Sequence, residues 1–320
     1  MVFLLKKILS GFILVIGLLI LTFFMLRLSP GNPAADMFDT THVQNAMMQK
    51  TTRLGLDRPI WLQFEGWIKE FVKGNWGNSF AKNQPVKKMI FNALPNTLLL
   101  TVSALLFQAV AGTLMGLLQV RFRNSLLDRT LDKIALLFYA LPGFWVALVL
   151  ILIFANFLHL LPVSQMVSYY YDGLSIAGKI QDRIFHLILP VIAMGLVALA
   201  GTARYVKNCT LDILSHDFIL AAKARGLSKT RILFKHALRN ILSPVVTLIG
   251  QNFPALVGGS VVIELIFSWP GMGRLIVMSS YARDYPVILA CTFVISLFVI
   301  LGNILTELIN AVLDPRIRLQ

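Results

Sequence analysis

Long apolar runs separated by short polar segments dominate this chain. Six runs carry almost no charge, at roughly 8–26, 97–120, 134–158, 185–203, 244–267 and 287–306. Each has about the 20 residues that a helix needs to cross the hydrocarbon core of a bilayer. The pattern therefore predicts an all-α integral membrane protein with six transmembrane helices.

Basic residues between the runs predict the orientation, because short loops rich in Lys and Arg stay on the cytosolic side. One side carries sixteen: Lys6, Lys7, Arg121, Arg123, Arg129, Lys133, Arg204, Lys207, Lys223, Arg225, Lys229, Arg231, Lys235, Arg239, Arg316 and Arg318. The short loops on the other side carry four: Lys179, Arg183, Arg274 and Arg283. Both termini are therefore expected in the cytosol.

These assignments divide the chain into four parts. They are the N-terminus with the first span (1–27), a small extracytoplasmic lobe (28–96), a transmembrane core (97–312) and a cytosolic tail (313–320). The lobe contains Trp61, Trp67 and Trp76 in amphipathic pieces. We expect these tryptophans at the level of the lipid headgroups, with a ligand site as the alternative.

Composition agrees with a bilayer as solvent. Hydrophobic residues make up 57% of the chain and charged residues 14%, and the mean hydropathy is +0.75. The net charge of +14 does not predict a nucleic-acid partner, because the basic residues occupy short gaps between apolar runs rather than one face of a soluble fold. The expected surroundings are membrane lipid.

The cytosolic segment 204–243 shows an internal design. Ser215 is placed to cap a helix whose first turn carries Asp217, and the run FILAAKARG ends in Gly226, which suits a left-handed C-terminal position. Ser228 is placed to cap a second helix that runs toward Pro244. The segment therefore predicts a helix-turn-helix.

The second of these helices has two different faces. Arg231, Lys235 and Arg239 are spaced by four and form a basic stripe. Another face is apolar and comprises Ile232, Leu233, Ala237 and Ile241. The stripe alone fits anionic headgroups as well as a protein. The small pair Ala221 and Ala222 favours docking of a protein, because small residues permit close approach.

The stretch LAAKARGLSKTRILFKHALRNILSP resembles the EAA loop of ABC-importer permeases. Ala221, Ala222 and Gly226 match its pattern. Leu220 replaces the usual Glu, and 236–239 replaces the usual Ile-x-Leu-Pro with only the Leu retained. These departures resemble the dipeptide, oligopeptide and nickel branch of the family.

Further segments resemble the B-type subunit of the dipeptide/oligopeptide permease pair. In chain order they are LRLSPGNPA, LGLDRPIWLQFEGWIKEFVKGNWGNSF, LPNTLLL, YALPGFWVAL, VVIELIFSWPGMGRL, RDYPVI and LDPRIR. Each is a weak signal alone. Their order and spacing, which cover most of the chain, make the resemblance strong.

The resemblance implies a type I ABC-importer permease fold in a bacterial inner membrane. It implies as partners a homologous C-type permease subunit, two cytosolic ABC ATPases and an extracytoplasmic substrate-binding protein. The ATPase-coupling residues would be Phe218, Leu220, Ala221, Ala222, Ala224, Arg225, Gly226, Leu227 and Ser228. The implied cargo is a di- or oligopeptide, with nickel or a metal chelate as the alternative.

Motifs for catalysis are absent from the sequence. It has no G-x-x-x-x-G-K-[ST] phosphate loop, so ATP and Mg²⁺ are expected in the partner ATPases and no cofactor on this chain. HExxH and GxSxG are also absent, and no two histidines share the spacing of metal ligands. An enzyme is therefore not expected. An ion-driven secondary carrier is a distant alternative, since the two halves of the chain are dissimilar.

Polar groups within the runs mark a candidate translocation path, because such groups are costly unless they face a cavity or a partner. They are Gln251, Asn252, Glu264, Asn303 and Glu307. Gln251 and Asn252 are the path candidates, with interhelical hydrogen bonding as the alternative. For Glu264 a structural role is favoured.

Helix-breaking residues mark candidate gates within two of the runs. Pro and Gly loosen or kink a helix, as a gate that rearranges requires. The gate candidates are Pro142, Gly143, Pro254, Gly258 and Gly259.

Overall fold

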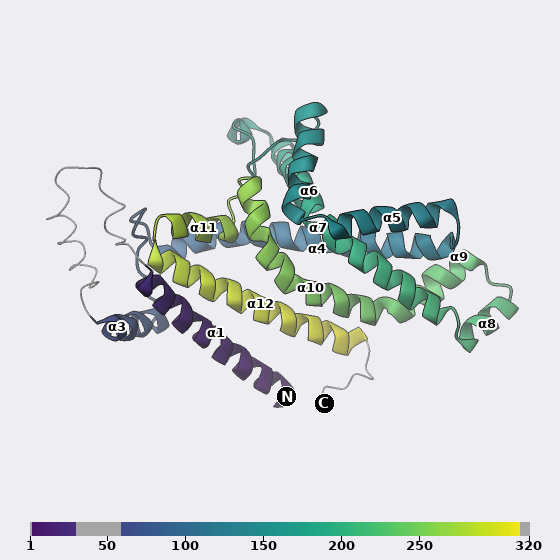
Figure 1. Ribbon diagram of the computed structural model, residues 1–320, viewed down its shortest axis with the longest axis horizontal. Helices are drawn as coiled ribbons and strands as arrows, with labels where there is room; N and C mark the ends of the chain where they lie inside the picture. Colours follow the sequence, from purple (N-terminus) through teal and green to yellow (C-terminus); the bar gives the residue numbers. More distant parts are fainter. Residues whose placement is uncertain (1, 30–58, 314–320) are drawn as a thin grey trace. The chain divides into compact units, whose positions relative to one another are not determined.

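The computed structural model describes residues 2–29 and 59–313 (Figure 1). Within them all regular elements are helices, and no β-strand is present. The predicted all-α class is confirmed. Residues 30–58 of the expected extracytoplasmic lobe, and 314–320 of the expected tail, lie outside the described residues.

Five described helices are long and apolar enough to cross a membrane. They include α1 (Val2–Leu28), α4 (Val86–Arg121), α7 (Ile176–Ile213) and α12 (Tyr285–Leu313). The fifth begins with α9 (Lys229–Arg231) and η4 (Ile232–Ala237) and continues as α10 (Leu238–Ile266). Most of these helices extend beyond the predicted spans, because the helical backbone continues into polar sequence.

The third predicted span, 134–158, is not one straight helix. α5 (Leu126–Ala140) is followed by α6 (Gly143–Leu150), which continues with wider turns as η2 (Ile151–Phe157), and the chain bends by 110° between α5 and α6. Pro142 explains the break: it lacks an N–H and holds Leu141 in an extended conformation with ψ of 139°. Six spans result if the bent pair is counted as one.

The chain folds as two compact units. Unit 1 comprises Met1–Asn96 with Gly271–Ile300, and unit 2 comprises Thr97–Pro270 with Leu301–Gln320. α4 and α12 contribute residues to both units.

Unit 1 has a core of apolar side chains from α3 (Ile60–Val72), α11 (Met272–Tyr281) and parts of α4 and α12, and Phe23 of α1 joins it through ring contacts with Phe64 and Trp67. Trp67 and Trp76 pack against this core, and the Trp76 ring stacks on Phe71 at 5.5 Å between centroids. Trp61 instead is 65% exposed. Trp67 and Trp76 are half-buried and their rings complete a core that the sequence pattern does not reveal, and the headgroup level of the three tryptophans stays a prediction.

Asp284 fixes a loop of unit 1 to the start of α12. Its buried carboxylate accepts hydrogen bonds from the N–H of Phe80 (2.9 Å), the N–H of Ala81 (3.3 Å) and the hydroxyl of Ser79. The Ser79 hydroxyl in turn accepts from the N–H of Lys82 at 2.8 Å. Both oxygens of the buried carboxylate therefore have hydrogen-bond donors.

In unit 2, α7 packs against α5, α6 and α10 (Figure 1). α4 also approaches α7 closely at Gly112 and Gly116. A Cβ on Gly116 would lie 2.5 Å from the carbonyl oxygen of Ala203, so only glycine fits. Beside this contact Gln108 Nε2 donates to Thr202 Oγ1 at 2.9 Å, and both residues are buried. Small residues and interhelical hydrogen bonds are the usual means of helix association in membranes.

Two further polar contacts join helices of unit 2. Lys207 Nζ of α7 lies 2.7 Å from Asp128 Oδ1 of α5. Glu264 of α10 is fully buried and accepts a hydrogen bond from Thr97 Oγ1 at 2.7 Å. The structural role favoured for Glu264 agrees with this contact.

Candidate functional site

The predicted helix-turn-helix consists of α8 (Asp217–Ala224), a turn at Gly226 and the helix that begins with α9. Gly226 has φ of +74°, a left-handed conformation that glycine adopts without steric cost. Its N–H donates to the Lys223 carbonyl at 2.9 Å, and the Leu227 N–H donates to the Ala222 carbonyl at 3.3 Å. These two hydrogen bonds form a Schellman motif and end α8 at the expected place.

The two predicted N-caps differ in outcome. The Ser228 side chain accepts from the Arg231 N–H at 3.3 Å, so this cap is confirmed. The Ser215 cap is wrong: His216 precedes α8 without a side-chain cap, and the Ser215 hydroxyl donates to the Asp212 carbonyl at 2.6 Å. α7 extends to Ile213, so Ser215 lies in the turn that ends α7 rather than at the start of α8.

Burial separates the coupling residues into two groups. Ala222 is buried with Ile219 and Ile232, and Leu227 packs against them. The exposed coupling residues are Phe218, Leu220, Ala221, Ala224, Arg225, Gly226 and Ser228. The expectation of an exposed pair is therefore wrong for Ala222. It follows Ile219 by three positions, which turns both toward the helix beneath.

The basic stripe and apolar face of the second helix are confirmed. Arg231, Lys235 and Arg239 are exposed. The apolar residues Ile232, Leu233, Ala237 and Ile241 are all buried. The expected loop 204–243 is thus a folded element whose two ends belong to α7 and α10.

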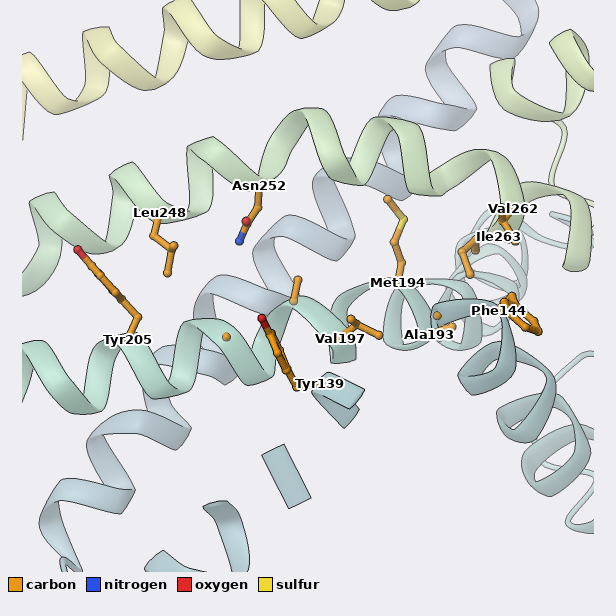
Figure 2. A pocket seen from close by; sticks show the side chains of 13 residues that line it. Tyr139, Phe144, Ala193, Met194, Val197, Tyr205, Leu248, Asn252, Val262 and Ile263 are labelled. Atoms are coloured by element: carbon orange, nitrogen blue, oxygen red, sulfur yellow. The ribbon is translucent and has the colours of Figure 1, made fainter. Parts of the chain in front are cut away.

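Unit 2 also contains a pocket of about 670 Å³ between α5, α6, α7 and α10 (Figure 2). Its lining is mostly apolar, with the hydroxyls of Tyr139 and Tyr205 and the amide of Asn252 as side-chain polar groups. Figure 2 shows the Asn252 amide and the Tyr139 hydroxyl pointing into the same space. No charged side chain is among its lining residues in the described part of the chain.

The path and gate candidates fall at different places. Asn252 is half-buried and lines the pocket, whereas Gln251 is exposed and is not a lining residue. Gly143 lines the pocket beside the bend at Pro142. α10 continues without a break through Pro254, Gly258 and Gly259, and Gly258 is exposed. Their roles in a path or gate stay predictions.

Sequence reasoning missed the two tyrosines of the pocket. Tyr205 falls inside the segment expected as a cytosolic loop, and Tyr139 lies just before the predicted kink at Pro142, where the sequence gives no sign of a pocket. It also missed the spacing of Gly112 and Gly116, a G-x-x-x-G signal for close helix packing that was available.

Solved structures show the same fold. The chain resembles, with a TM-score of 0.59 and 19% identity, a chain from inward-facing conformations of the MetNI methionine ABC transporter, covering 72% of this chain and 98% of that one. At this identity the likeness shows the fold alone, which is a bundle of bilayer-length helices that carries a pocket and a helix-turn-helix.

Family models identify the chain further. Residues 108–319 match the inner membrane component of binding-protein-dependent transport systems, and residues 1–101 match the N-terminal model of such a membrane component. The chain belongs to this family and is a multi-pass inner membrane protein.

Several curated relatives match over nearly the full length. The oligopeptide transport system permease protein AppB of Bacillus subtilis is 35% identical over 98% of both chains. The dipeptide transport system permease protein DppB of Escherichia coli is 34% identical over 95% of this chain and 94% of its own. The di/tripeptide permease protein DppB of Pseudomonas aeruginosa is 35% identical over 95% of each.

Proposed function

We propose that this chain is a permease subunit of a bacterial ABC importer for di- and oligopeptides and forms half of the translocation path. The observation that carries the cargo class is the set of relatives named as peptide permeases, which match over 94–98% of the lengths compared. Nickel or a metal chelate is disfavoured by the same names.

The pocket supports a tolerant path for such a cargo. Its wall offers two hydroxyls and one amide on an apolar surface, without a fixed charge among the described lining residues. Neutral hydrogen-bonding groups pair with a peptide backbone and do not select one charged side chain over another. The homologous C-type subunit supplies the other half of the path, and the substrate-binding protein makes most of the selection.

The exposed face of α8 couples the path to ATP. Leu220 and Ala224 lie one turn apart on the face opposite the buried Ala222, where Leu220 is 55% exposed. A small, partly apolar surface on a helix held by the Gly226 turn suits the groove of an ATPase. With α8 in the cytosol, both termini of the chain are cytosolic. Two ATPases bind the ATP and Mg²⁺, and this chain holds no cofactor and catalyses no reaction.

Reconstitution of the complete importer in proteoliposomes tests the proposal. We expect uptake of a labelled dipeptide that requires ATP and the binding protein. Ala224→Arg should abolish uptake, because a long cation on this face blocks the close approach of the ATPase. Asn208→Arg, on an exposed position of α7, is the matched control and should retain uptake. Nickel uptake without peptide uptake would show that the cargo is nickel rather than a peptide. Normal peptide uptake by Ala224→Arg would show that this face of α8 does not dock the ATPase.

A further inference from the structure

A second pocket of unit 2 lies beside the helix-turn-helix, away from the exposed face of α8 that is proposed for the ATPase, and of the expected coupling residues only Leu227 lines it. Its volume is about 640 Å³. It is lined by the end of α4, the end of α7, the flank of α8 with its turn, and the start of the following helix: Val120, Arg121, Phe122, Leu214, Lys223, Leu227, Lys229, Thr230, Ile232 and Leu233. Figure 1 shows α8 and α9 at the same end of unit 2 as the connection from α4 to α5.

The lining combines an apolar floor with a cationic rim. Val120, Ile232 and Leu233 are buried, whereas Arg121, Lys223 and Lys229 are exposed. Among the lining residues that the structure describes there are three cations and no carboxylate. None of the three cations forms an ion pair with a described residue. Three like charges around an apolar recess call for an anionic ligand that also has an apolar part.

Arg121 is held toward this recess. Its guanidinium donates a hydrogen bond to the Thr230 hydroxyl across the pocket. The contact joins the end of α4 to the start of the helix after the Gly226 turn. It holds the Arg121 guanidinium at the rim of the pocket.

The connection beside the pocket exposes apolar side chains where a cytosolic loop should be polar. Phe122 of this connection is exposed, and so are Leu126 (81%) and Leu127 in the first turn of α5. Such side chains are expected at the boundary between headgroups and acyl chains rather than in water. This argues for a lipid rather than a free phosphate ion.

The pocket also lies off the face proposed for the ATPase. Successive helical residues are rotated by about 100°, so Lys223 lies on the flank of α8, one step from the buried Ala222. Leu220 and Ala224 lie on the opposite face. An ATPase seated on the opposite face leaves the flank with Lys223 to another ligand.

We propose that this pocket binds the phosphate-bearing headgroup of an anionic phospholipid of the cytosolic leaflet, with Arg121, Lys223 and Lys229 on the headgroup and Leu227, Ile232 and Leu233 against its acyl part. Basic pockets at the cytosolic ends of membrane helices recognise such headgroups. The side of the membrane rests on the proposed orientation. A lipid in this position contacts the turn that holds α8, so it stabilises the coupling element.

The test measures lipid retained by the complete importer. The complex is exchanged into nanodiscs of phosphatidylcholine alone or of phosphatidylcholine with phosphatidylglycerol, extracted in detergent, and examined by native mass spectrometry. We expect phosphatidylglycerol to remain bound to the wild type. The triple variant R121Q/K223Q/K229Q should bind it about a hundredfold more weakly, since each cation near an anionic headgroup contributes about fivefold.

The matched control removes the same charge from the exposed stripe outside the pocket, as R231Q/K235Q/R239Q. This variant should retain the lipid as the wild type does. Equal loss in both variants would mean general attraction to an anionic surface and would overturn the site. Equal retention in the wild type and the pocket variant would overturn it as well.

Two further arms separate other ligands. Inorganic phosphate added during extraction should not displace the lipid, and displacement at equal concentration would assign the pocket to a free anion. Loss of the ATPases from the pocket variant, with lipid retained, would assign the surface to a protein and contradict the proposal. Lipid retention is measured without any cargo. A failure of peptide uptake by the wild type would therefore refute the proposed function but leave the lipid site unaffected.

Discussion

At the scale of single residues, neighbours in the sequence have different roles. Ala221 and Ala222 both match the family motif, yet Ala221 is exposed on α8 and Ala222 is packed on Ile219 and Ile232. Asn252 lines the pocket of unit 2, and Gln251 does not. The rotation of a helix by about 100° per residue separates each pair. Matched substitutions at adjacent positions therefore distinguish surface, core and path.

The turn at Gly226 should tolerate only residues that accept a left-handed backbone. With φ of +74°, a β-branched side chain is strongly strained, whereas Asn adopts this region more readily. We expect Gly226→Val to lose most ATP-coupled uptake while the amount of protein in the membrane stays normal. Gly226→Asn should retain much of it. ATP-coupled uptake is measured in proteoliposomes, and the amount of protein in the membrane is measured by immunoblotting. Normal uptake by Gly226→Val would show that this turn does not position α8.

A comparison of Asn252 with the neighbouring Gln251 tests whether Asn252 lines the translocation path or only adds a polar group to its helix. Loss of a single hydrogen-bonding group typically costs about two- to tenfold. We expect Asn252→Leu to lower peptide uptake by about that factor at unchanged expression, and Gln251→Leu to leave uptake near the wild-type rate. Initial rates of dipeptide uptake provide the measurement. A larger effect at Gln251 than at Asn252 would place the path elsewhere.

At the scale of elements, close packing of α4 on α7 organises unit 2. Gly112 and Gly116 permit the approach, and the buried Gln108–Thr202 hydrogen bond lies beside them. α7 also holds α5 through Lys207 and Asp128. The pocket, the bend at Pro142 and the helix-turn-helix are all built on α7 and its neighbours, so errors in this packing should affect each of them.

Gly116→Ala should destabilise the protein measurably. The added Cβ would lie 2.5 Å from the Ala203 carbonyl oxygen, and such overpacking typically costs about 1–3 kcal/mol. We expect a lower Tm of the detergent-solubilised protein. Gly201→Ala is the control, because a Cβ on Gly201 meets no atom within 4 Å. Equal Tm values for the two variants would show that close contact between α4 and α7 at Gly116 does not contribute to the stability of the protein.

At the scale of the whole molecule, the distribution of Lys and Arg predicts the orientation of the chain in the membrane. Sixteen basic residues lie on the side assigned to the cytosol and four in the short loops of the other side. Unit 1 contains the loop that Asp284 fixes, and unit 2 contains α8. The predicted orientation places the segment around Gln84 outside and α8 inside.

Labelling of single cysteines tests this orientation. The background carries Cys209→Ala and Cys291→Ala, which removes the two cysteines of the chain. A membrane-impermeant maleimide on spheroplasts should label Gln84→Cys but not Asp217→Cys, and both should react after permeabilisation. Both positions are exposed. Labelling of Asp217→Cys in sealed spheroplasts would reverse the assignment.

Short-range rules in the sequence determined much of this protein. The apolar runs predicted the bilayer-length helices, because length and hydropathy alone decide whether a helix can cross a membrane. Gly226 and Ser228 predicted the turn and the second cap of the helix-turn-helix, because both act within a few residues of chain. The EAA-like motif and the ordered segments predicted the permease family that the comparisons confirm.

Only the tertiary structure decided which side chains meet across helices. The burial of Ala222, the core around Trp67 and Trp76, and the tyrosines that line the pocket depend on the positions of distant segments, whereas the kink at Pro142 was predicted and only its angle of 110° was not. Hydropathy is nearly uniform along a membrane helix and carries no periodic signal for the face that packs, because lipid and protein interior are similarly apolar. The sequence therefore predicts the helices and their ends, and packing decides which of their residues form a pocket, a core or a docking surface.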